Sequence, residues 1–266
     1  MNIKIRGLKN LRDLGGITLP NGLVTRHGLI LRSDSLHALS EEDCRTLGAQ
    51  MRLATVIDLR TPIEIEERPD IVPEGVEYFH IPMFREKTIG ISKETGSDIG
   101  HYIKHTWNRK AIHAAIPDME QVYSGVMTDK YSIGQIRRAL HIIIRNTIEG
   151  KATLFHCSQG KDRTGALGAL LLSLLGADSK TIEADYVEGG RIYRRKALKD
   201  AVLITLFKWC PSDAITVYHA DKAEPEFIRA AFKTIEERWG DALTMFRTEM
   251  GILEELRSQF IAAATI

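Results

Sequence analysis

The most constraining feature of the sequence is the segment 152–177, in which an apolar run leads into a glycine-bearing loop and then into a second apolar run. The first run, ATLFH (152–156), predicts a buried strand, and the run after the loop predicts a helix. In such a unit the loop N–H groups and the positive end of the helix form an anion site. The formal net charge of the chain is only +1, so any attraction for anions must be local.

The loop places Cys157 six residues before Arg163. A nucleotide-binding loop needs GxxxxGK followed by Ser or Thr. Here Phe155 stands at the first glycine position and Asp162 follows the lysine, which excludes that function. A free thiol has a pKa of about 8.5, but amide dipoles, a helix N-terminus and a guanidinium all favour the thiolate. The pattern therefore predicts a nucleophilic cysteine aimed at a phosphoryl group.

The loop residues have distinct expected roles in this chemistry. Arg163 can hold two phosphoryl oxygens in a bidentate fork. The Cys157 thiolate would attack phosphorus in line and form a thiophosphate intermediate that water hydrolyses. Thr164 can donate a hydrogen bond to the cysteine sulfur, and His156 is expected to support the loop backbone. The expected phosphate-binding residues are Ser158, Gln159, Gly160, Lys161, Asp162 and Arg163. The alternative is a cysteine that is merely buried at a strand end.

Short β-rich segments and amphipathic segments alternate along the first part of the chain. Besides ATLFH, the predicted strands are LILRS (29–33), ATVIDLR (54–60) and VEYFHIP (76–82). Ser40 and Asp43 predict a capped helix start, and apolar residues recur at helical spacing from Ser132 until Gly150 closes the segment. These patterns predict an α/β fold with a mostly parallel central sheet flanked by helices.

The organisation of the chain favours one domain spanning residues 1–266. Residues 86–130 fit the alternation less well and are expected to be a lid inserted near the site, while residues 178–266 are expected to form a helical C-terminal part. The apolar content of 44% and charged content of 27% are ordinary for a globular protein. The near-zero net charge gives no reason to expect a nucleic-acid partner.

The cysteines and the first residues of the chain indicate the cellular compartment in which the protein is expected. Cys44, Cys157 and Cys210 are far apart, form no CxxC pair and are odd in number, so we expect neither a disulfide framework nor a metal site. The start lacks the apolar core of a signal peptide, and the longest apolar run (166–177) is too short to span a bilayer. We therefore expect a cytoplasmic protein without a transmembrane segment. Export by a route that needs no signal peptide stays open.

HCSQGKDRTG (156–165) resembles the HCxxGxxR[ST]G signature of the protein tyrosine phosphatase superfamily. The form HCxxGKDRTG is similar to the tyrosine/serine phosphatase family of bacteria and fungi. NLRDLGG (10–16), IDLRTPIEIEERPD (57–70) and EADYVEG (183–189) resemble other blocks of that family. The resemblance implies a single α/β phosphatase fold with an inserted helical lid, a cysteine-dependent phosphoric monoester hydrolase, and no metal or other cofactor.

The general acid is not identified by the resemblance. Many relatives carry an Asp on a movable loop after the strand before the lid, and here Arg85 and Glu86 stand at that place. Asp118, in Ile116-Pro117-Asp118, is more typical of an N-terminal helix carboxylate. Asp162 lies beside the phosphate position and could protonate a leaving oxygen if the bound anion favours its protonated form. It could equally be a loop-stabilising carboxylate, so the acid remains open.

The substrate is expected to be phosphotyrosine in proteins, with phosphoserine or phosphothreonine as a wider, dual specificity. Lys161 adds a second positive charge to the loop, and in the phosphoinositide-cleaving branch of the superfamily such a lysine accompanies inositol headgroups. A phosphoinositide or inositol phosphate is therefore an alternative substrate, and a catalytically inactive phosphate-binding scaffold is a second alternative. Asp58 and Arg60 are expected to support the loop or to pair within the scaffold. The oligomeric state and a redox role for Cys44 or Cys210 stay open.

Overall fold

The computed structural model describes residues 5–85, 118–194, 198–199, 202 and 222–266. Of the expected lid (86–130), residues 86–117, including Glu86, lie outside the described residues. So do residues 195–197, 200–201 and 203–221 of the expected C-terminal part, including Cys210. The single-domain organisation stays a prediction. Among the helices of the described part, none is both long and apolar enough to cross a membrane.

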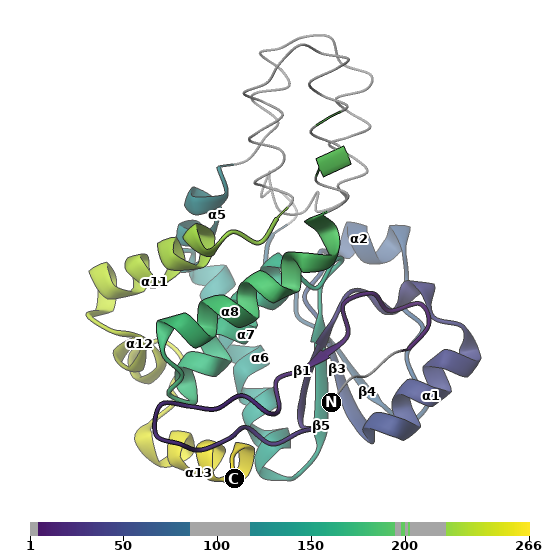
Figure 1. Ribbon diagram of the computed structural model, residues 1–266, viewed down its shortest axis with the longest axis horizontal. Helices are drawn as coiled ribbons and strands as arrows, with labels where there is room; N and C mark the ends of the chain where they lie inside the picture. Colours follow the sequence, from purple (N-terminus) through teal and green to yellow (C-terminus); the bar gives the residue numbers. More distant parts are fainter. Residues whose placement is uncertain (1–4, 86–117, 195–197, 200–201, 203–221) are drawn as a thin grey trace.

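A five-stranded sheet in the order β1-β2-β5-β3-β4 forms the centre of the described structure (Figure 1). Strand β1 pairs antiparallel with β2, and the other pairs are parallel. This confirms the predicted α/β class with a mostly parallel sheet. The strands are β1 (Arg12–Asp13), β2 (Ile30–Ser33), β3 (Leu53–Asp58), β4 (Glu77–His80) and β5 (Ala152–His156). Only the two-residue β1 escaped the sequence analysis, because it is too short to show an alternation of apolar and polar residues.

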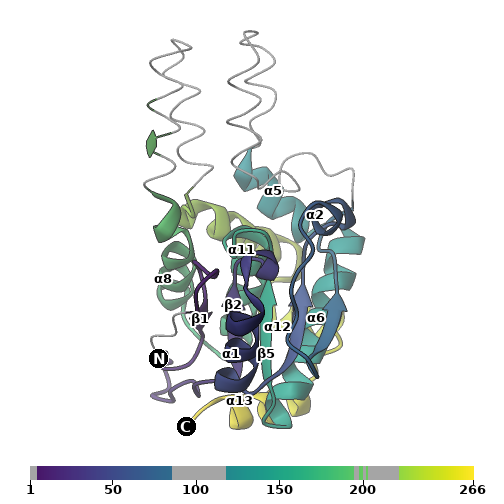
Figure 2. The same ribbon diagram turned by 90° about the vertical axis from the view of Figure 1, so that its right-hand side faces the viewer.

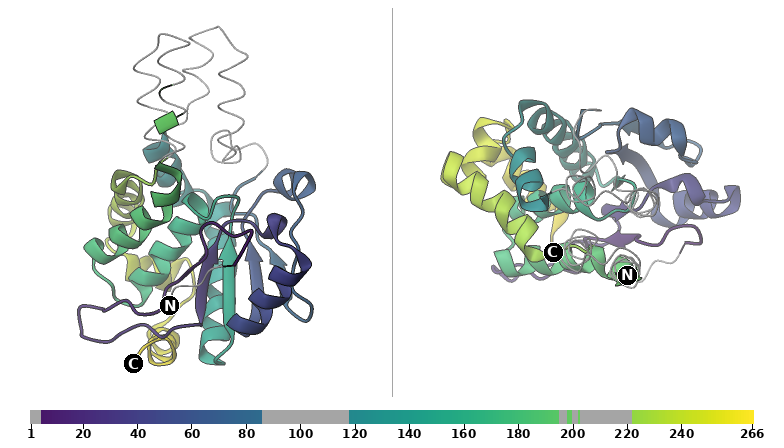
Figure 3. Two further views of the ribbon diagram at one scale, coloured as in Figure 1. Left: turned by 45° about the vertical axis from the view of Figure 1, so that its right-hand side comes forward. Right: turned by 90° about the horizontal axis from the view of Figure 1, so that it is seen from above.

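Helices cover both faces of the sheet (Figure 3). The helices preceding the central loop are η1 (Leu36–Ala38), α1 (Glu41–Met51), α2 (Pro62–Glu67), α5 (Met119–Val126) and α6 (Lys130–Ile148). Those following it are α7 (Asp162–Leu174), α8 (Ser179–Gly190), η2 (Arg191–Tyr193), α11 (Pro225–Trp239), α12 (Ala242–Thr248) and α13 (Glu254–Ala264). In two views α13 lies below the sheet, at the opposite end from α2 (Figures 1 and 2).

Strand β5 shows why the sheet is buried on both sides. All five of its residues are buried, as expected for a central strand of a parallel sheet. Leu154 belongs to a small apolar cluster shared with α1, whereas Phe155 faces the larger cluster formed with α6 and α7. Alternate side chains of one strand therefore anchor two helical layers, and this holds the loop after β5 between them.

Two helix starts illustrate how local sequence sets the elements. The Ser40 side chain accepts a hydrogen bond from Asp43 N at 3.0 Å, which confirms the predicted start of α1. Helix α6 begins two residues before the predicted Ser132, because the Asp129 carboxylate caps it by accepting from Ser132 N at 2.9 Å. Side-chain caps of this kind satisfy N–H groups that the helix itself leaves unpaired.

The parallel register brings the ends of three strands to one edge of the sheet. Ser33 of β2 and Asp58 of β3 are both in register with His156 of β5. The chain segments that follow these three residues therefore emerge side by side, at the edge where open α/β sheets bind ligands. This is where Cys157 lies.

Candidate active site

Cys157 directly follows β5, and the loop 157–161 leads into α7 at Asp162. The Cys157 side chain is fully buried. Gly160 has a φ of +68°, and a Cβ there would collide with the carbonyl group of Ser33 at the end of β2. Only glycine fits both the left-handed backbone and this close approach, so the tight loop packs directly on the neighbouring strand.

The loop carbonyls are bound from outside the loop or from the helix that follows it. His156 Nδ1 donates to Cys157 O (3.2 Å), and Ser35 N donates to Ser158 O (3.4 Å). Further bonds to these carbonyls are Ser35 Oγ to Ser158 O (3.4 Å), Asn10 Nδ2 to Gln159 O (2.9 Å) and to Gly160 O (3.2 Å), Tyr193 Oη to Gln159 O (2.8 Å), Arg32 Nη2 to Gly160 O (3.1 Å) and Gly165 N to Lys161 O (2.8 Å). The C=O and N–H of a trans peptide point in opposite directions. Because the carbonyls are bound outside the loop, the N–H groups of the same peptides can point toward a single anion inside it.

Arg163, in the first turn of α7, is held by Glu64 of α2. The guanidinium and the carboxylate make two parallel contacts, Nη1–Oε2 at 2.7 Å and Nη2–Oε1 at 2.8 Å. Burial alone would raise the pKa of Glu64, but the hydrogen bonds and charge of Arg163 outweigh it and the pKa lies below its ordinary value. Ser158 Oγ also donates to Glu64 Oε1 at 2.5 Å. One carboxylate thus orients two of the expected phosphate-binding residues.

Glu64 was missed by the sequence analysis. Its segment was singled out only as a block of the resemblance, and nothing in TPIEIEERPD distinguishes this glutamate from Glu66 and Glu67 except its place three residues after Thr61. Thr61 N donates to Glu64 Oε2 at 2.9 Å. The helix-start pattern was therefore the one available signal, and it predicts a cap rather than a partner for an arginine distant in sequence.

His156, Asp58 and Arg60 form a buried charged cluster under the loop, together with Asp70. Arg60 contacts both carboxylates, Asp58 at 2.6 Å and Asp70 at 2.7 Å. His156 Nε2 lies 3.1 Å from Asp70 Oδ2. Burial would lower the pKa of His156, but the charges of Asp58 and Asp70 outweigh it and the pKa is raised. The cluster therefore fixes His156, whose Nδ1 donates a hydrogen bond to the Cys157 carbonyl.

A metal ion is a conceivable occupant of this cluster, because ligand atoms of Asp58, Asp70 and His156 lie within 4.8 Å of one another. The Arg60 guanidinium already lies against both carboxylates. A divalent cation would have to displace that positive charge, which is the natural counter-ion of a buried acidic pair. We therefore assign no metal to these residues.

Asp162 is buried and is contacted on both oxygens. Tyr123 Oη of α5 donates to Asp162 Oδ1 at 2.9 Å, and Lys161 Nζ lies 3.3 Å from Oδ2. Tyr186 Oη of α8 donates in turn to Tyr123 Oη at 2.7 Å. Burial and the neighbouring Asp162 charge raise the pKa of Tyr123 well above its ordinary value, so the phenol stays a hydrogen-bond donor. Two tyrosines distant in sequence thus orient the Asp162 carboxyl.

The other expected site residues are placed as follows. Thr164 is fully buried and its hydroxyl makes no hydrogen bond to any described residue, so the expected bond to the Cys157 sulfur is not formed in this structure. Asp118 is the N-cap of α5 and accepts from Gln121 N at 3.2 Å.

Cys44 belongs to the apolar cluster shared with α1, whereas Cys157 belongs to the larger cluster on the other face. The structure does not bring these two thiols together.

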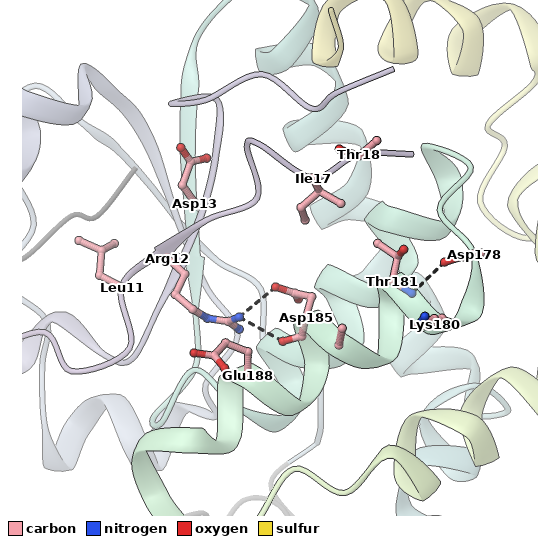
Figure 4. A pocket seen from close by; sticks show the side chains of 11 residues that line it. Leu11, Arg12, Asp13, Ile17, Thr18, Asp178, Lys180, Thr181, Asp185 and Glu188 are labelled. Atoms are coloured by element: carbon pink, nitrogen blue, oxygen red, sulfur yellow. Dashed lines mark hydrogen bonds and ion pairs between the residues drawn. The ribbon is translucent and has the colours of Figure 1, made fainter. Parts of the chain in front are cut away.

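The N-terminal segment lies behind the loop, where Asn10 and Arg12 meet α8. Arg12 Nη1 contacts Asp185 Oδ1 at 2.9 Å, and Arg32 Nη1 contacts Asp185 Oδ2 at 2.6 Å. Figure 4 shows the Arg12 side chain directed at Asp185, on one side of an open pocket of about 870 Å³ between the N-terminal segment and α8. The sequence marked these segments as family blocks but did not show that they meet behind the loop.

Comparisons with known proteins agree with this geometry. The sequence model described as the tyrosine phosphatase family matches residues 3–263. The triple specificity protein phosphatase PtpB of Mycobacterium tuberculosis is 25% identical over 257 residues, covering 89% of this chain and 90% of that protein. A Cupriavidus necator protein that carries the name of a tyrosine-protein phosphatase is 24% identical over 259 residues, covering 96% of this chain and 86% of that protein.

Among solved structures, the crystal structure of TpbA from P. aeruginosa aligns with a TM-score of 0.34 and 13% identity, over 79% of this chain and 89% of that chain. The strand order and parallel pairing of the sheet show the fold class, and the match across residues 3–263 shows the family.

Proposed function

The chain belongs to the tyrosine phosphatase family, and on that premise we propose that it hydrolyses phosphomonoesters through a covalent phosphoryl intermediate on Cys157. One observation carries the proposal: Cys157 begins a loop whose carbonyls accept hydrogen bonds from outside it, and the guanidinium of Arg163, six residues later, is held in one orientation by Glu64. A thiol, a ring of amides and a planar cation are what transfer of a phosphoryl group to a nucleophile requires.

The chemistry proceeds in two steps. The Cys157 thiolate attacks phosphorus and displaces the alcohol or phenol oxygen, which takes up a proton. Water then attacks the thiophosphate, releasing inorganic phosphate and restoring the thiolate. Arg163 stabilises the charge that spreads over the equatorial oxygens in both steps. Thr164, whose buried hydroxyl has no hydrogen-bond partner among the described residues, is our candidate donor to the departing sulfur in the second.

Asp162 is our candidate for the proton donor in the first step. Its carboxyl lies in the loop, and Tyr123 and Lys161 set its orientation. For this role the carboxyl must carry a proton when substrate is bound, so that it can donate to the leaving oxygen. Asp118 is occupied as the N-cap of α5, which supports Asp162 over it.

The preferred substrate in this proposal is phosphotyrosine in proteins. The name of the mycobacterial relative, a triple specificity phosphatase, supports a wider range that includes phosphoserine or phosphothreonine. A phosphoinositide or inositol phosphate is the second candidate. The observation that favours it is Lys161, a second cation that is buried within the loop.

Phosphate release in the presence of EDTA tests the proposal. Wild type and Cys157→Ser are assayed on a phosphotyrosine peptide, a phosphoserine peptide and short-chain phosphoinositides. We expect turnover by wild type and none by the serine variant, and the preferred panel member gives the substrate class. A wild-type protein that binds phosphate but is inert on every substrate would support the inactive scaffold instead.

A further inference from the structure

A group of two arginines and one aspartate, partly open to the pocket of Figure 4, lies directly behind the phosphate loop. Arg12 and Arg32 contact the two different oxygens of Asp185, at 2.9 and 2.6 Å. The Arg32 side chain is fully buried. Glu188 also lies near Arg12, but it is half-exposed and pairs with Arg191 at 3.2 Å. Within the group of three, two cations share one carboxylate, so a positive charge remains in excess behind the loop.

Arg32 is the member of this group that reaches the loop. Its Nη1 contacts Asp185, and its Nη2 donates to Gly160 O at 3.1 Å. The two ends of one rigid guanidinium thus join α8 to a loop carbonyl. Arg12 has the same partner, Asp185, and its described hydrogen bonds go only to that residue.

The close approach of α8 depends on Gly189. A Cβ at this position would lie 2.8 Å from Arg12 Nη2 and 3.2 Å from Arg32 Nη2. The backbone of Gly189 also accepts from Asn10 Nδ2 at 2.9 Å, the same amide that donates to Gln159 O and Gly160 O. The segments around Asn10, Arg32 and Gly189 therefore enclose one side of the loop.

The consequence for anion binding follows from peptide geometry. The Gly160 carbonyl belongs to the peptide whose N–H is that of Lys161, and the two groups point in opposite directions. A buried cation on the carbonyl keeps that oxygen away from a bound anion and polarises the N–H toward it, since hydrogen bonds in a chain strengthen one another.

We propose that Arg32 is a positioning residue of the phosphate site, which acts through the Gly160–Lys161 peptide, and that Asp185 of α8 holds it there. The inference rests on the proposed function only in taking the loop as the phosphate site. It adds α8 and the N-terminal segment to that site, although neither lies in the signature sequence.

Two matched variants separate positioning from general stability. Arg32→Gln and Arg12→Gln each remove one of the two cations on Asp185, but only the first removes the loop contact. Binding of tungstate, a tetrahedral dianion that the protein cannot hydrolyse, is measured calorimetrically together with the melting temperature. We expect Arg32→Gln to raise the dissociation constant about tenfold, the size of one charge-assisted hydrogen bond. Arg12→Gln should change it less than about twofold.

Arg32→Lys serves where the glutamine variant does not fold. Lysine keeps the buried charge but lacks the planar fork that joins Asp185 to Gly160, so tungstate binding should still weaken by at least about threefold. Wild-type tungstate affinity in a folded Arg32 variant, or equal weakening by Arg12→Gln, would overturn the inference. So would a wild-type protein that binds no tungstate. A wild type that binds tungstate without any turnover contradicts the proposed function alone.

Discussion

Arg163 and Glu64, which are 99 positions apart in the sequence, form a buried two-point ion pair with N–O distances of 2.7 and 2.8 Å. The pair joins the first turn of α7 to α2 and sets the plane of the guanidinium. Because a guanidinium has five N–H donors in one plane, a carboxylate on one edge determines which edge can face a phosphoryl group. The orientation of the candidate phosphate-binding arginine is therefore determined by a residue outside the loop.

Glu64→Gln should lower kcat/KM for p-nitrophenyl phosphate by roughly 10- to 100-fold, because the buried arginine loses its charged partner. The steady-state rate of wild type and variant gives the comparison. Glu67→Gln, an exposed position at the end of the same helix, is the control and should stay within about twofold. Equal activity of Glu64→Gln and wild type would show that Arg163 does not need this partner.

Tyr123→Phe removes the hydroxyl that donates to Asp162 Oδ1. If Asp162 is the proton donor, its misplacement should reduce kcat roughly tenfold for a substrate with a poor leaving group, such as a phosphoserine peptide, and much less for p-nitrophenyl phosphate. The measurement is the ratio of the two rates. Tyr131→Phe, a half-buried position on α6, is the control. A uniform loss on both substrates would indicate a structural effect only.

Asp118→Asn separates the two described candidates for the acid. Asparagine is as good an N-cap as aspartate, so both the melting temperature and the rate on every substrate should remain close to wild type. Asp162→Asn should instead slow substrates with poor leaving groups by roughly 100-fold. Loss of activity in Asp118→Asn at unchanged stability would transfer the acid role to Asp118.

The buried His156 cluster should give the protein a pH-dependent stability. Burial opposes the charge of His156, but Asp58 and Asp70 raise its pKa above the ordinary 6.5. A raised pKa contributes stability that is fully present below the unfolded value and is lost as the pH rises through the folded value. The stability advantage of wild type over His156→Gln should therefore be full below about pH 6.5 and decrease as the pH rises through the folded pKa. Melting temperatures measured from about pH 6 upward test it, and an advantage that grows with pH would contradict a charged His156.

How much of this site could be predicted from the sequence depends on how far apart in the sequence the contacting residues are. Cys157, Gly160 and Arg163 lie within seven residues and form a local strand–loop–helix unit, so their spacing alone predicted the chemistry. The strands were predictable because a buried parallel strand is a short, continuous apolar run. Such signals come from residues that are close together in the sequence. The predictions of the fold that rest on them are the ones that the structure confirms.

The supporting residues could not be predicted, because their partners are distant in the sequence. Glu64 reaches Arg163, Asp185 reaches Arg32 across 153 positions, and Tyr123 reaches Asp162. A single glutamate or tyrosine on a helix has the same local pattern whether it faces solvent or a buried arginine. Only the packing of α2, α5 and α8 around the loop shows which ones matter.

The most direct test of the account is to look for the phosphoryl group on Cys157. Wild type is mixed rapidly with p-nitrophenyl phosphate, quenched, digested and analysed by mass spectrometry. The account predicts a phosphoryl adduct on the peptide that contains Cys157, formed no slower than turnover, and neither adduct nor turnover in Cys157→Ser. Phosphate release that continues in Cys157→Ser, or turnover by wild type without any adduct on this peptide, would contradict it.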